Sequence, residues 1–266
     1  MKDKVVVITG ASSGIGCALA VKFIEEGANV VLSARRYEKI KAIEDKYGSG
    51  RVLAIQTDVS REEDCKKLIE KTVEKFGTID VLVNNAGVSM RAMFSVCDLS
   101  VLKHLMDVNL WGTVYCTKYA LPFLLQRKGS VVGITSVAGY FGLPGRTGYS
   151  ASKFASRGFL EALRIEYSKR DLHVLIVAPG FVNTEVRESA LRADGTPQGK
   201  SPRNEKGMMS ANRCAKLIYN AINRRKRQLT ISLVEGKMAI FISKWWPQLV
   251  ERVNYRLLKN EPECPF

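Results

Sequence analysis

The feature that most constrains the fold of this chain is a glycine-rich turn between its first apolar run and its first helical pattern. The run Val5–Thr9 leads into residues 10–16, which read GASSGIG, and a helical pattern follows at once. Such glycines let the backbone approach a pyrophosphate closely, and the free N–H groups at the start of the next helix attract it. Glycine also serves ordinary turns, but a position after a strand and before a helix is the context that a dinucleotide site requires. We therefore predict that a dinucleotide binds at Gly10, Ser12, Ser13, Gly14, Ile15 and Gly16.

Short β-branched runs alternate with helical patterns along most of the chain, which is typical of a parallel sheet with helices on both faces. The runs carry few charges, as expected for strands that are buried on both sides. The expected strands are Val5–Thr9, Asn29–Ser33, Val52–Thr57, Val81–Asn84, Ser130–Ile134, His173–Val177 and Gln228–Leu233. The expected helices include Gly14–Glu26, Arg61–Lys75, Val101–Arg127 and Gly148–Lys169. We predict one α/β domain over residues 1–266, with a Rossmann-type doubly wound parallel sheet of about seven strands.

Two segments do not follow this rhythm. Residues 185–209 are polar and rich in glycine and proline, and a loop of that length usually has a function, so we expect a substrate lid. Residues 236–266 form a C-terminal amphipathic extension that mixes large apolar side chains, including Trp245 and Trp246, with lysine and arginine. Pro247 is expected to divide the extension into two short helices. The extension either lies on an anionic membrane surface or packs against the substrate pocket or a second subunit.

Composition narrows the kinds of partner. The net charge of +15 invites an anionic partner, but no nucleic-acid-binding module accompanies it, so we expect no nucleic acid. The six cysteines form no CxxC pair and there are two histidines, which argues against a metal site and against a disulfide framework. The first apolar run is too short for a signal peptide, and no run is long enough to span a membrane. We expect a cytoplasmic protein, at most peripheral to the inner face of a membrane.

Further motifs follow the expected strands in a fixed order. They are Asp58-Val59 after the third strand, Asn84-Asn85-Ala86-Gly87 after the fourth, Tyr149 and Lys153 after the fifth, and Pro179-Gly180 after the sixth. Together with the TGxxxGxG turn, this order resembles the short-chain dehydrogenase/reductase family. The resemblance implies a nicotinamide cofactor. It implies further contacts with that cofactor at Asp58, Val59, Asn85, Ala86, Gly87, Tyr149, Lys153, Pro179, Gly180, Val182 and Thr184.

The end of the second expected strand indicates which nicotinamide cofactor is preferred. Sites for NAD usually carry an acid there, which binds the ribose 2′-hydroxyl. This chain has Ala34 at that place, followed by Arg35 and Arg36, and a guanidinium can pair with a 2′-phosphate. The hydroxyl groups of Ser12 and Ser13 could add donors. We predict NADP(H) rather than NAD; the alternative is that both arginines are surface charges at the start of a helix.

Tyr149 and Lys153 lie one turn apart on one face of an expected helix, and Ser136 ends the preceding strand. A phenol is a poor acid at neutral pH, and a nearby ammonium lowers its pKa. We expect Tyr149 to exchange a proton with the substrate oxygen, Lys153 to lower the pKa of Tyr149, and Ser136 to hold that oxygen. The resemblance adds Asn109 as a fourth catalytic residue that anchors a water relaying protons to Lys153; the alternative for Asn109 is local capping of backbone groups.

These residues predict an NADP-dependent oxidoreductase that interconverts a ketone and a secondary alcohol. Residues 86–93 and 143–148 and the basic tail resemble the branch that contains 11β-hydroxysteroid dehydrogenase, which implies a hydrophobic, steroid- or lipid-like substrate and a role in lipid metabolism. A 3-ketosphinganine or 3-oxoacyl reductase is the alternative activity, and a non-catalytic NADP(H)-binding sensor or scaffold is the alternative to an enzyme. The resemblance also implies a homodimer or homotetramer, paired through the helices expected at Val101–Arg127 and Gly148–Lys169.

Overall fold

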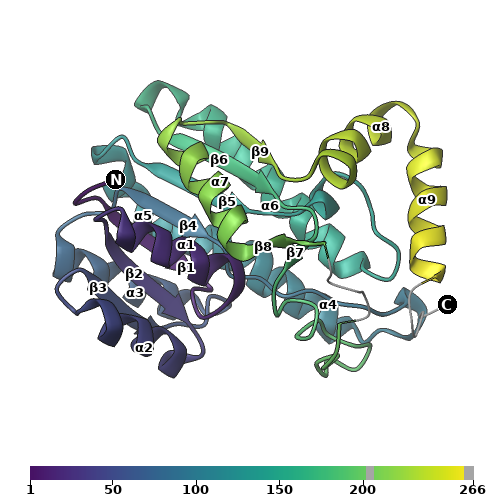
Figure 1. Ribbon diagram of the computed structural model, residues 1–266, viewed down its shortest axis with the longest axis horizontal. Coiled ribbons are helices and arrows are strands. Elements are labelled where there is room, and N and C mark those ends of the chain that lie inside the picture. The colour runs from purple at the N-terminus through teal and green to yellow at the C-terminus, as the bar shows by residue number, and fades with distance from the viewer. Residues whose placement is uncertain (202–206, 261–266) are drawn as a thin grey trace.

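The computed structural model describes residues 1–201 and 207–260 (Figure 1). Its centre is a seven-stranded sheet in the order β3-β2-β1-β4-β5-β6-β9, in which every neighbouring pair is parallel. The strands are β1 (Val5–Thr9), β2 (Asn29–Ala34), β3 (Val52–Gln56), β4 (Val81–Asn84), β5 (Ser130–Ile134), β6 (His173–Ala178) and β9 (Gln228–Thr230). The strand order reverses direction between β1 and β4, which is where doubly wound sheets bind their ligands. The predicted Rossmann-type sheet is confirmed.

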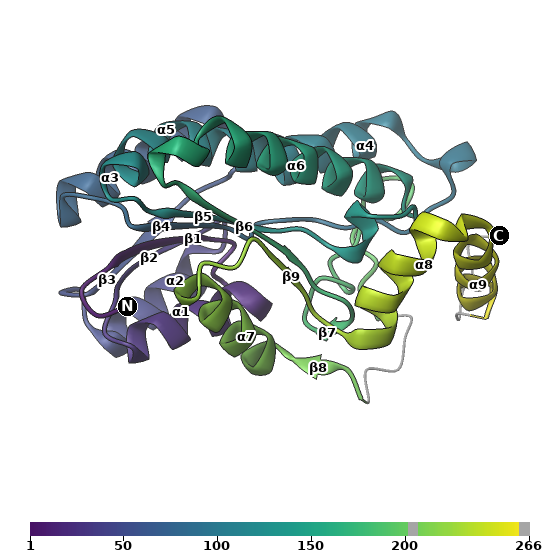
Figure 2. The ribbon, with the colours of Figure 1, turned by 90° about the horizontal axis from the view of Figure 1, so that it is seen from above.

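Helices cover both faces of the sheet, as Figure 2 shows. One layer consists of α3 (Glu62–Phe76), α4 (Leu99–Met106), α5 (Gly112–Gln126) and α6 (Thr147–Glu166), and the other of α1 (Gly14–Glu25), α2 (Tyr37–Tyr47) and α7 (Ala211–Asn223). Each layer buries its own apolar cluster: Leu19 and Ile218 belong to one cluster, and Leu68, Leu124 and Leu160 belong to the other. Short 3₁₀ turns occur at η1 (Phe94–Val96), η3 (Val137–Gly139) and η4 (Ser168–Arg170).

The helix expected as one piece at Val101–Arg127 is divided. It consists of α4, a π-helical turn η2 (Asp107–Trp111), and α5. Asn109 lies in that turn, and its side chain bonds both the N–H and the carbonyl oxygen of Val88, at 2.9 and 3.0 Å. A π-helical turn inserts one extra residue and is frequent at functional sites. The π-helical turn thus coincides with a tertiary contact that hydrophobic periodicity does not encode.

The described part of the expected lid has little regular structure. At its two ends, β7 (Val182–Asn183) pairs with β8 (Met209–Ser210), and between them Leu191 forms isolated bridges with Met90 and Pro197. Residues 202–206 of this segment lie outside the described residues. So do residues 261–266 of the extension, which include Cys264.

The C-terminal extension forms two helices after the π-helical η5 (Leu233–Met238). β9 ends at Thr230, three residues before the end expected at Leu233. Pro247 divides the extension as predicted, into α8 (Ala239–Trp245) and α9 (Pro247–Lys259). Both helices stand off one end of the sheet, opposite the end formed by α2 and α3 (Figure 1). Within residues 1–201 and 207–260, we find no helix with the length and apolar character needed to cross a bilayer.

Candidate active site

The glycine-rich turn packs against the loop that follows β4, and this contact explains why two of its residues are glycine. Gly10 has a positive φ of 66°, and a Cβ there would lie 2.8 Å from the Cα of Ala86. A Cβ on Gly16 would collide with the carbonyl oxygen of Gly10 and the side chain of Asn85. The Asn85 amide nitrogen in turn donates to the carbonyl oxygens of Thr9 and Gly10, at 2.9 and 3.1 Å. The two motifs therefore form one rigid cradle, with the first N–H groups of α1 at its edge.

Arg36 closes this cradle on one side. Its guanidinium donates to the hydroxyl of Ser12 at 3.0 Å and to that of Ser13 at 2.7 Å, and it forms an ion pair with Glu185 at 2.8 Å. Arg35 also lines the cavity and is exposed, but no side-chain bond within the described residues joins it to the serines. Both predicted arginines thus lie beside the glycine turn, and Arg36 has the more direct contact with it. Glu185 is a participant that the sequence did not reveal.

A single large cavity of about 1160 Å³ runs from the glycine turn, past the carboxyl ends of the central strands, to α8 and α9. All but three of the predicted site residues line it. The exceptions are Gly14, Gly16 and Asn109. Pro179, Gly180, Val182 and Thr184 line the part of the cavity next to the turn, and a Cβ on Gly14 would lie 3.0 Å from the Thr184 methyl group. The cradle, the helix N-terminus and the cationic group at Arg36 fit a nicotinamide dinucleotide.

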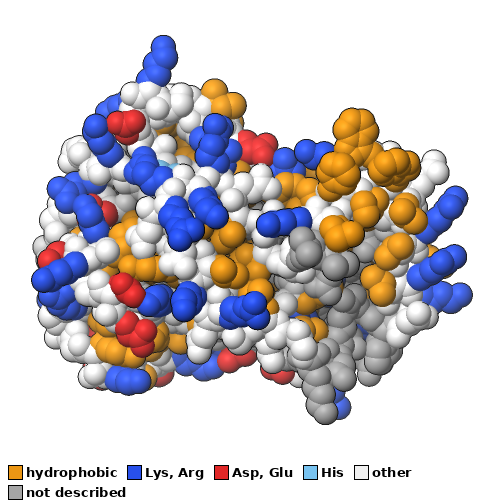
Figure 3. All heavy atoms as spheres, turned by 45° about the horizontal axis from the view of Figure 1, so that its top comes forward, with side chains coloured by type: hydrophobic (Ala, Val, Ile, Leu, Met, Phe, Trp, Pro, Cys, Tyr) orange, Lys and Arg blue, Asp and Glu red, His pale blue; other side chains and the backbone are white. Residues whose placement is uncertain are grey.

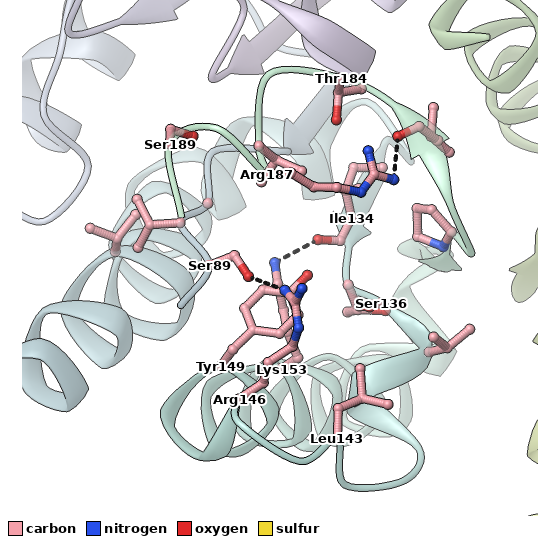
Figure 4. Close-up of a pocket in the computed structure, with 18 of the residues that line it drawn as sticks. Ser89, Ile134, Ser136, Leu143, Arg146, Tyr149, Lys153, Thr184, Arg187 and Ser189 are labelled. Atoms are coloured by element: carbon pink, nitrogen blue, oxygen red, sulfur yellow. Dashed lines mark hydrogen bonds between the residues drawn. The ribbon is translucent and has the colours of Figure 1, made fainter. Parts of the chain in front are cut away.

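Tyr149, Lys153 and Ser136 meet at the middle of this cavity (Figure 4). Tyr149 and Lys153 project from neighbouring turns of α6, with the Lys153 Nζ 5.8 Å from the centre of the Tyr149 ring. Ser136 follows β5, and its hydroxyl lies near enough to the Tyr149 phenol to lower the pKa of that phenol. The Lys153 Nζ donates to the Ile134 carbonyl oxygen at 3.1 Å, which fixes the ammonium beneath the phenol. The three groups therefore share one space in which a substrate oxygen can lie.

Burial is the main influence on the pKa values of Tyr149 and Lys153. Burial raises the pKa of Tyr149, while the nearby Ser136 hydroxyl and the charges of Arg146 and Arg187 act in the opposite direction. Burial also lowers the pKa of Lys153 to about 8. The lysine therefore remains an ammonium at neutral pH, and the phenol remains protonated and ready to donate.

Asn109 and Lys153 both lie close to Gly87. A Cβ added to Gly87 would lie 3.0 Å from the Asn109 Oδ1 and 3.3 Å from the Lys153 Nζ. Besides its two bonds to Val88, the Asn109 amide nitrogen donates to the Ser152 hydroxyl at 2.8 Å. Its side chain thus ties the loop after β4 to α6. These bonds reach a distant loop and are not the local capping considered as the alternative for Asn109, and the water relay remains a prediction.

Several lining residues were not singled out in the sequence. Arg146 and Arg187 flank Tyr149, and Ser89, His104 and Ser189 also face the cavity. No short spacing rule marks them, because they come from separate loops and helices. The extension was expected either to pack or to bind lipid, and one side of it closes the cavity with Met238, Ala239, Ile242, Leu249, Val250, Val253, Leu257 and Leu258. No group of three or more metal-ligating side chains occurs in the described part of the chain.

Comparison with known proteins gives a consistent result. The family model described as short chain dehydrogenase matches residues 4–195. The "11-beta-hydroxysteroid dehydrogenase-like 6" of Arabidopsis thaliana is 42% identical over 99% of this chain and 79% of its own length. The "Dehydrogenase/reductase SDR family protein 7-like" of Dictyostelium discoideum is 35% identical over 97% of this chain and 83% of its own.

Solved structures share the fold. A short-chain dehydrogenase from Streptomyces avermitilis superposes with a TM-score of 0.82 at 27% identity, covering 97% of this chain and 98% of the other. An alcohol dehydrogenase from Thermococcus sibiricus, complexed with 5-hydroxy-NADP, gives 0.75 at 26% identity over 86% of this chain and 94% of the other. A Burkholderia phymatum short-chain dehydrogenase/reductase in complex with NAD gives 0.77 at 25% identity over 86% and 88%. Proteins of this fold thus bind either nicotinamide dinucleotide.

Proposed function

Because the chain belongs to the short-chain dehydrogenase/reductase family, we propose that it interconverts a ketone and a secondary alcohol with NADP(H). The observation that carries the proposal is the convergence of Tyr149, Ser136 and Lys153 in one cavity beside the glycine turn. The apolar wall contributed by α8 and α9, together with relatives named for hydroxysteroid dehydrogenases, supports a hydrophobic, steroid- or lipid-like substrate.

The residues of the site divide the reaction between them. In the reductive direction, a nicotinamide held beside the glycine turn would supply the hydride that the carbonyl carbon needs. Tyr149 donates its phenolic proton to the carbonyl oxygen, and Ser136 donates a hydrogen bond to the same oxygen, which stabilises the charge that develops there. The Lys153 ammonium stabilises the phenolate that remains on Tyr149. The C=O bond thus becomes CH–OH, and the reverse steps oxidise an alcohol.

The test of this function is the variant Tyr149→Phe, which removes only the proton-transferring hydroxyl. We expect the wild type to oxidise NADPH with hydrophobic ketones, and the variant to lose about 99% or more of that turnover, the scale of general acid catalysis. NADPH binding, followed by fluorescence titration, should be unchanged. Retention of most activity in a folded variant contradicts the mechanism, and a wild type that binds NADPH but reduces no ketone supports a sensor or scaffold.

We propose NADP(H) over NAD for the cofactor, on the strength of two arginines and two serine hydroxyls at the place where an acid would select NAD. Arg36 already touches both hydroxyls. The lid segment 185–209 reaches the same region through Glu185, which pairs with Arg36 and Lys39 at 2.8 and 3.4 Å. We propose that this segment covers the substrate and the cofactor together.

We propose a homodimer or homotetramer that pairs through α5 and α6. Large apolar side chains are exposed along this side of the molecule: Trp111, Phe154 and Ile165 are exposed by 45, 44 and 72%. Burial of such a surface between subunits is favourable at roughly 25 cal/mol per Å². Light scattering of the purified protein at micromolar concentration tests this assembly.

We also propose that the extension touches the inner face of a membrane from the cytoplasm. Phe241, Trp245 and Trp246 are 60, 67 and 62% exposed, and Figure 3 shows apolar side chains gathered at the end of the molecule that α8 and α9 form. The cysteines within the described residues carry free thiols, which supports a reducing compartment.

A further inference from the structure

Arg36 is already bound to an anionic group of the chain itself. Its Nη1 donates to the Glu185 carboxylate at 2.8 Å, and its Nη2 donates to the hydroxyls of Ser12 and Ser13 at 3.0 and 2.7 Å. The Lys39 ammonium lies 3.4 Å from the other oxygen of the same carboxylate. One carboxylate thus lies between two cations, beside the two hydroxyls of the glycine turn.

This carboxylate lies where the 2′-phosphate of NADP(H) is expected. Arg36 follows β2, at the place where an acid would select NAD, and Arg36 and Glu185 both line the cavity. A guanidinium fork matches the oxygens of a carboxylate and of a phosphate equally well. Two anionic groups in contact repel each other, so both cannot lie favourably at this place. The carboxylate and a 2′-phosphate therefore compete for the same guanidinium.

A phosphate has the advantage in this competition. The side chains of Arg36 and Glu185 are each 47% exposed, and ion pairs with that exposure contribute little stability. The hydrogen bond from Arg36 lowers the pKa of Glu185, so the carboxylate carries its single charge at neutral pH. A phosphate monoester carries about 1.5 to 2 negative charges at that pH and three strong acceptor oxygens. Lys39, which holds the same carboxylate, adds a second cation for the phosphate.

Glu185 begins the lid segment, which has a second attachment further along the chain. The Ser189 N–H and hydroxyl both donate to the Glu185 carbonyl oxygen at 3.0 Å, so residues 185–189 form one turn. The Leu191 N–H donates to the Ser89 carbonyl oxygen at 2.8 Å, and the Leu191 carbonyl oxygen accepts from the Arg91 N–H at 2.8 Å. Loss of the contact at Glu185 therefore leaves the attachment at Leu191 in place.

Resting on the proposed use of NADP(H), we propose that the Glu185 carboxylate occupies the 2′-phosphate site of the cofactor-free enzyme and is displaced from Arg36 when NADP(H) binds. Displacement releases the turn 185–189, which contributes to the wall opposite Tyr149 (Figure 4), while Leu191 holds the rest of the lid. NAD carries no 2′-phosphate and leaves the ion pair intact. Glu185 is thus a specificity-determining residue that weakens NADP(H) binding and links the lid to the identity of the cofactor.

Calorimetric titration with NADP⁺ and NAD⁺, which differ only in the 2′-phosphate, tests the competition. We expect Glu185→Gln to lower the Kd for NADP⁺ by about fivefold or more, because a neutral amide neither pairs with Arg36 nor repels the phosphate. The Kd for NAD⁺ should change by less than about twofold. Glu188→Gln is the matched control, because it removes the same charge from the same turn, and no ion pair joins Glu188 to Arg36 among the described residues. Its two Kd values should equal those of the wild type.

The outcomes separate this proposal from the proposed cofactor preference. A wild-type preference for NADP⁺ that Glu185→Gln does not increase refutes the displacement alone. Weaker NADP⁺ binding by this variant would show that the carboxylate orients Arg36 instead, and also overturns the proposal. Equal binding of both cofactors by the wild type and by the variant refutes the displacement and the NADP(H) preference together.

Hydrogen exchange tests the lid in the wild type, independently of any variant. Exchange of the amides in residues 185–190 is compared in the protein saturated with NADP⁺ and with NAD⁺. We expect exchange at least about threefold faster with NADP⁺, because the released turn opens more readily. The Leu191 and Arg91 amides, which belong to the second attachment, should exchange equally in both complexes. Equal exchange of the turn in the two complexes overturns the proposal.

Discussion

At the scale of single residues, Lys153 shows a conflict between activity and stability. Its ammonium is buried in a cavity wall, and it donates a hydrogen bond to the Ile134 carbonyl oxygen. Burial of a charged amine costs free energy, and the lowering of its pKa to about 8 expresses that cost. The buried ammonium reduces stability, but the proposed reaction needs a cation next to the Tyr149 phenol.

We therefore predict that Lys153→Met raises the free energy of unfolding at pH 7 while it removes activity. A lowering from 10.5 to about 8 corresponds to about 3 kcal/mol, and loss of the bond to Ile134 subtracts about 1 kcal/mol. The unfolded lysine keeps its proton up to about pH 10.5, whereas the folded one loses it near pH 8. Wild-type stability should therefore rise with pH across this window, and the advantage of the variant should shrink. Urea unfolding of the cofactor-free proteins at pH 7 and pH 10 measures both effects, and a variant less stable than the wild type at pH 7 contradicts the argument.

The two arginines after β2 should differ in their importance for the cofactor. Arg36 bonds both serine hydroxyls of the glycine turn, whereas Arg35 approaches the cavity without such a bond among the described contacts. We predict a wild-type preference for NADPH over NADH that falls by about tenfold or more in Arg36→Ala, and by less in Arg35→Ala, since each lost charge-assisted contact is worth that much. Cofactor kcat/KM ratios measure this. Equal use of NADH and NADPH by the wild type would refute the preference. A larger fall of the NADPH preference in Arg35→Ala than in Arg36→Ala would show that Arg35 is the more important of the two.

At the scale of elements, the sequence predicted the strands and helices whose hydrophobic pattern reflects burial in the sheet and its covering layers. The charge-free runs identified all seven strands of the main sheet, because strands buried on both faces admit few charges. The positions of Tyr149, Lys153 and Ser136 followed from where helices and strands end. The π-helical turn at Asp107–Trp111 was not predicted, and the bonds that its Asn109 forms with the distant Val88 leave no mark in the local pattern. The approach of Arg187 to Tyr149 depends likewise on how the lid folds back, which no local pattern records.

Asp80, which directly precedes β4, joins the amino end of β4 to the amino end of β1. Its carboxylate, with a side chain only 6% exposed, accepts from the Val5 backbone N–H, the Lys4 ammonium and the Arg127 guanidinium at 3.0, 3.0 and 3.1 Å. Burial alone would raise the pKa of Asp80, but these bonds outweigh it and lower the pKa. Because the folded pKa is lowered, the contribution to stability is complete above the unfolded value and is lost as pH falls through the folded one.

Asp80→Asn should therefore lower the free energy of unfolding by about 1 to 3 kcal/mol at neutral pH, since a buried bond to charged partners is lost. The deficit should diminish as the pH falls below about 4. Asp171→Asn is the matched control, because its carboxylate forms an exposed ion pair with Lys128 at 3.0 Å, and such pairs contribute little. Denaturant titrations at several pH values measure the two variants, and an equal, small effect of both would show that Asp80 does not join the strands.

At the scale of the whole molecule, the C-terminal extension combines exposed aromatic side chains with exposed lysine and arginine. Phe241, Trp245 and Trp246 project from or beside α8, while Lys244 and Arg252 are exposed close to them in sequence. The opposite side of the same two helices closes the cavity. A surface that combines large aromatic groups with cations is typical of a protein that lies on an anionic bilayer. An apolar substrate could then enter the cavity from the lipid without crossing water.

We predict that the full-length protein sediments with liposomes that contain phosphatidylserine and much less with liposomes of phosphatidylcholine alone, because each well-placed lysine or arginine adds about 1 kcal/mol on an anionic surface. The double variant Trp245→Ser, Trp246→Ser should bind at least about tenfold more weakly, since both rings lose their place at the interface. Leu217→Ser is the matched control, because Leu217 is 37% exposed and lies on α7, away from the extension and from the proposed α5–α6 interface. Its liposome binding should equal that of the wild type. If the wild type stays in the supernatant, and the tryptophan variant changes the oligomeric mass instead, the exposed aromatic side chains pack between subunits and the membrane proposal is wrong.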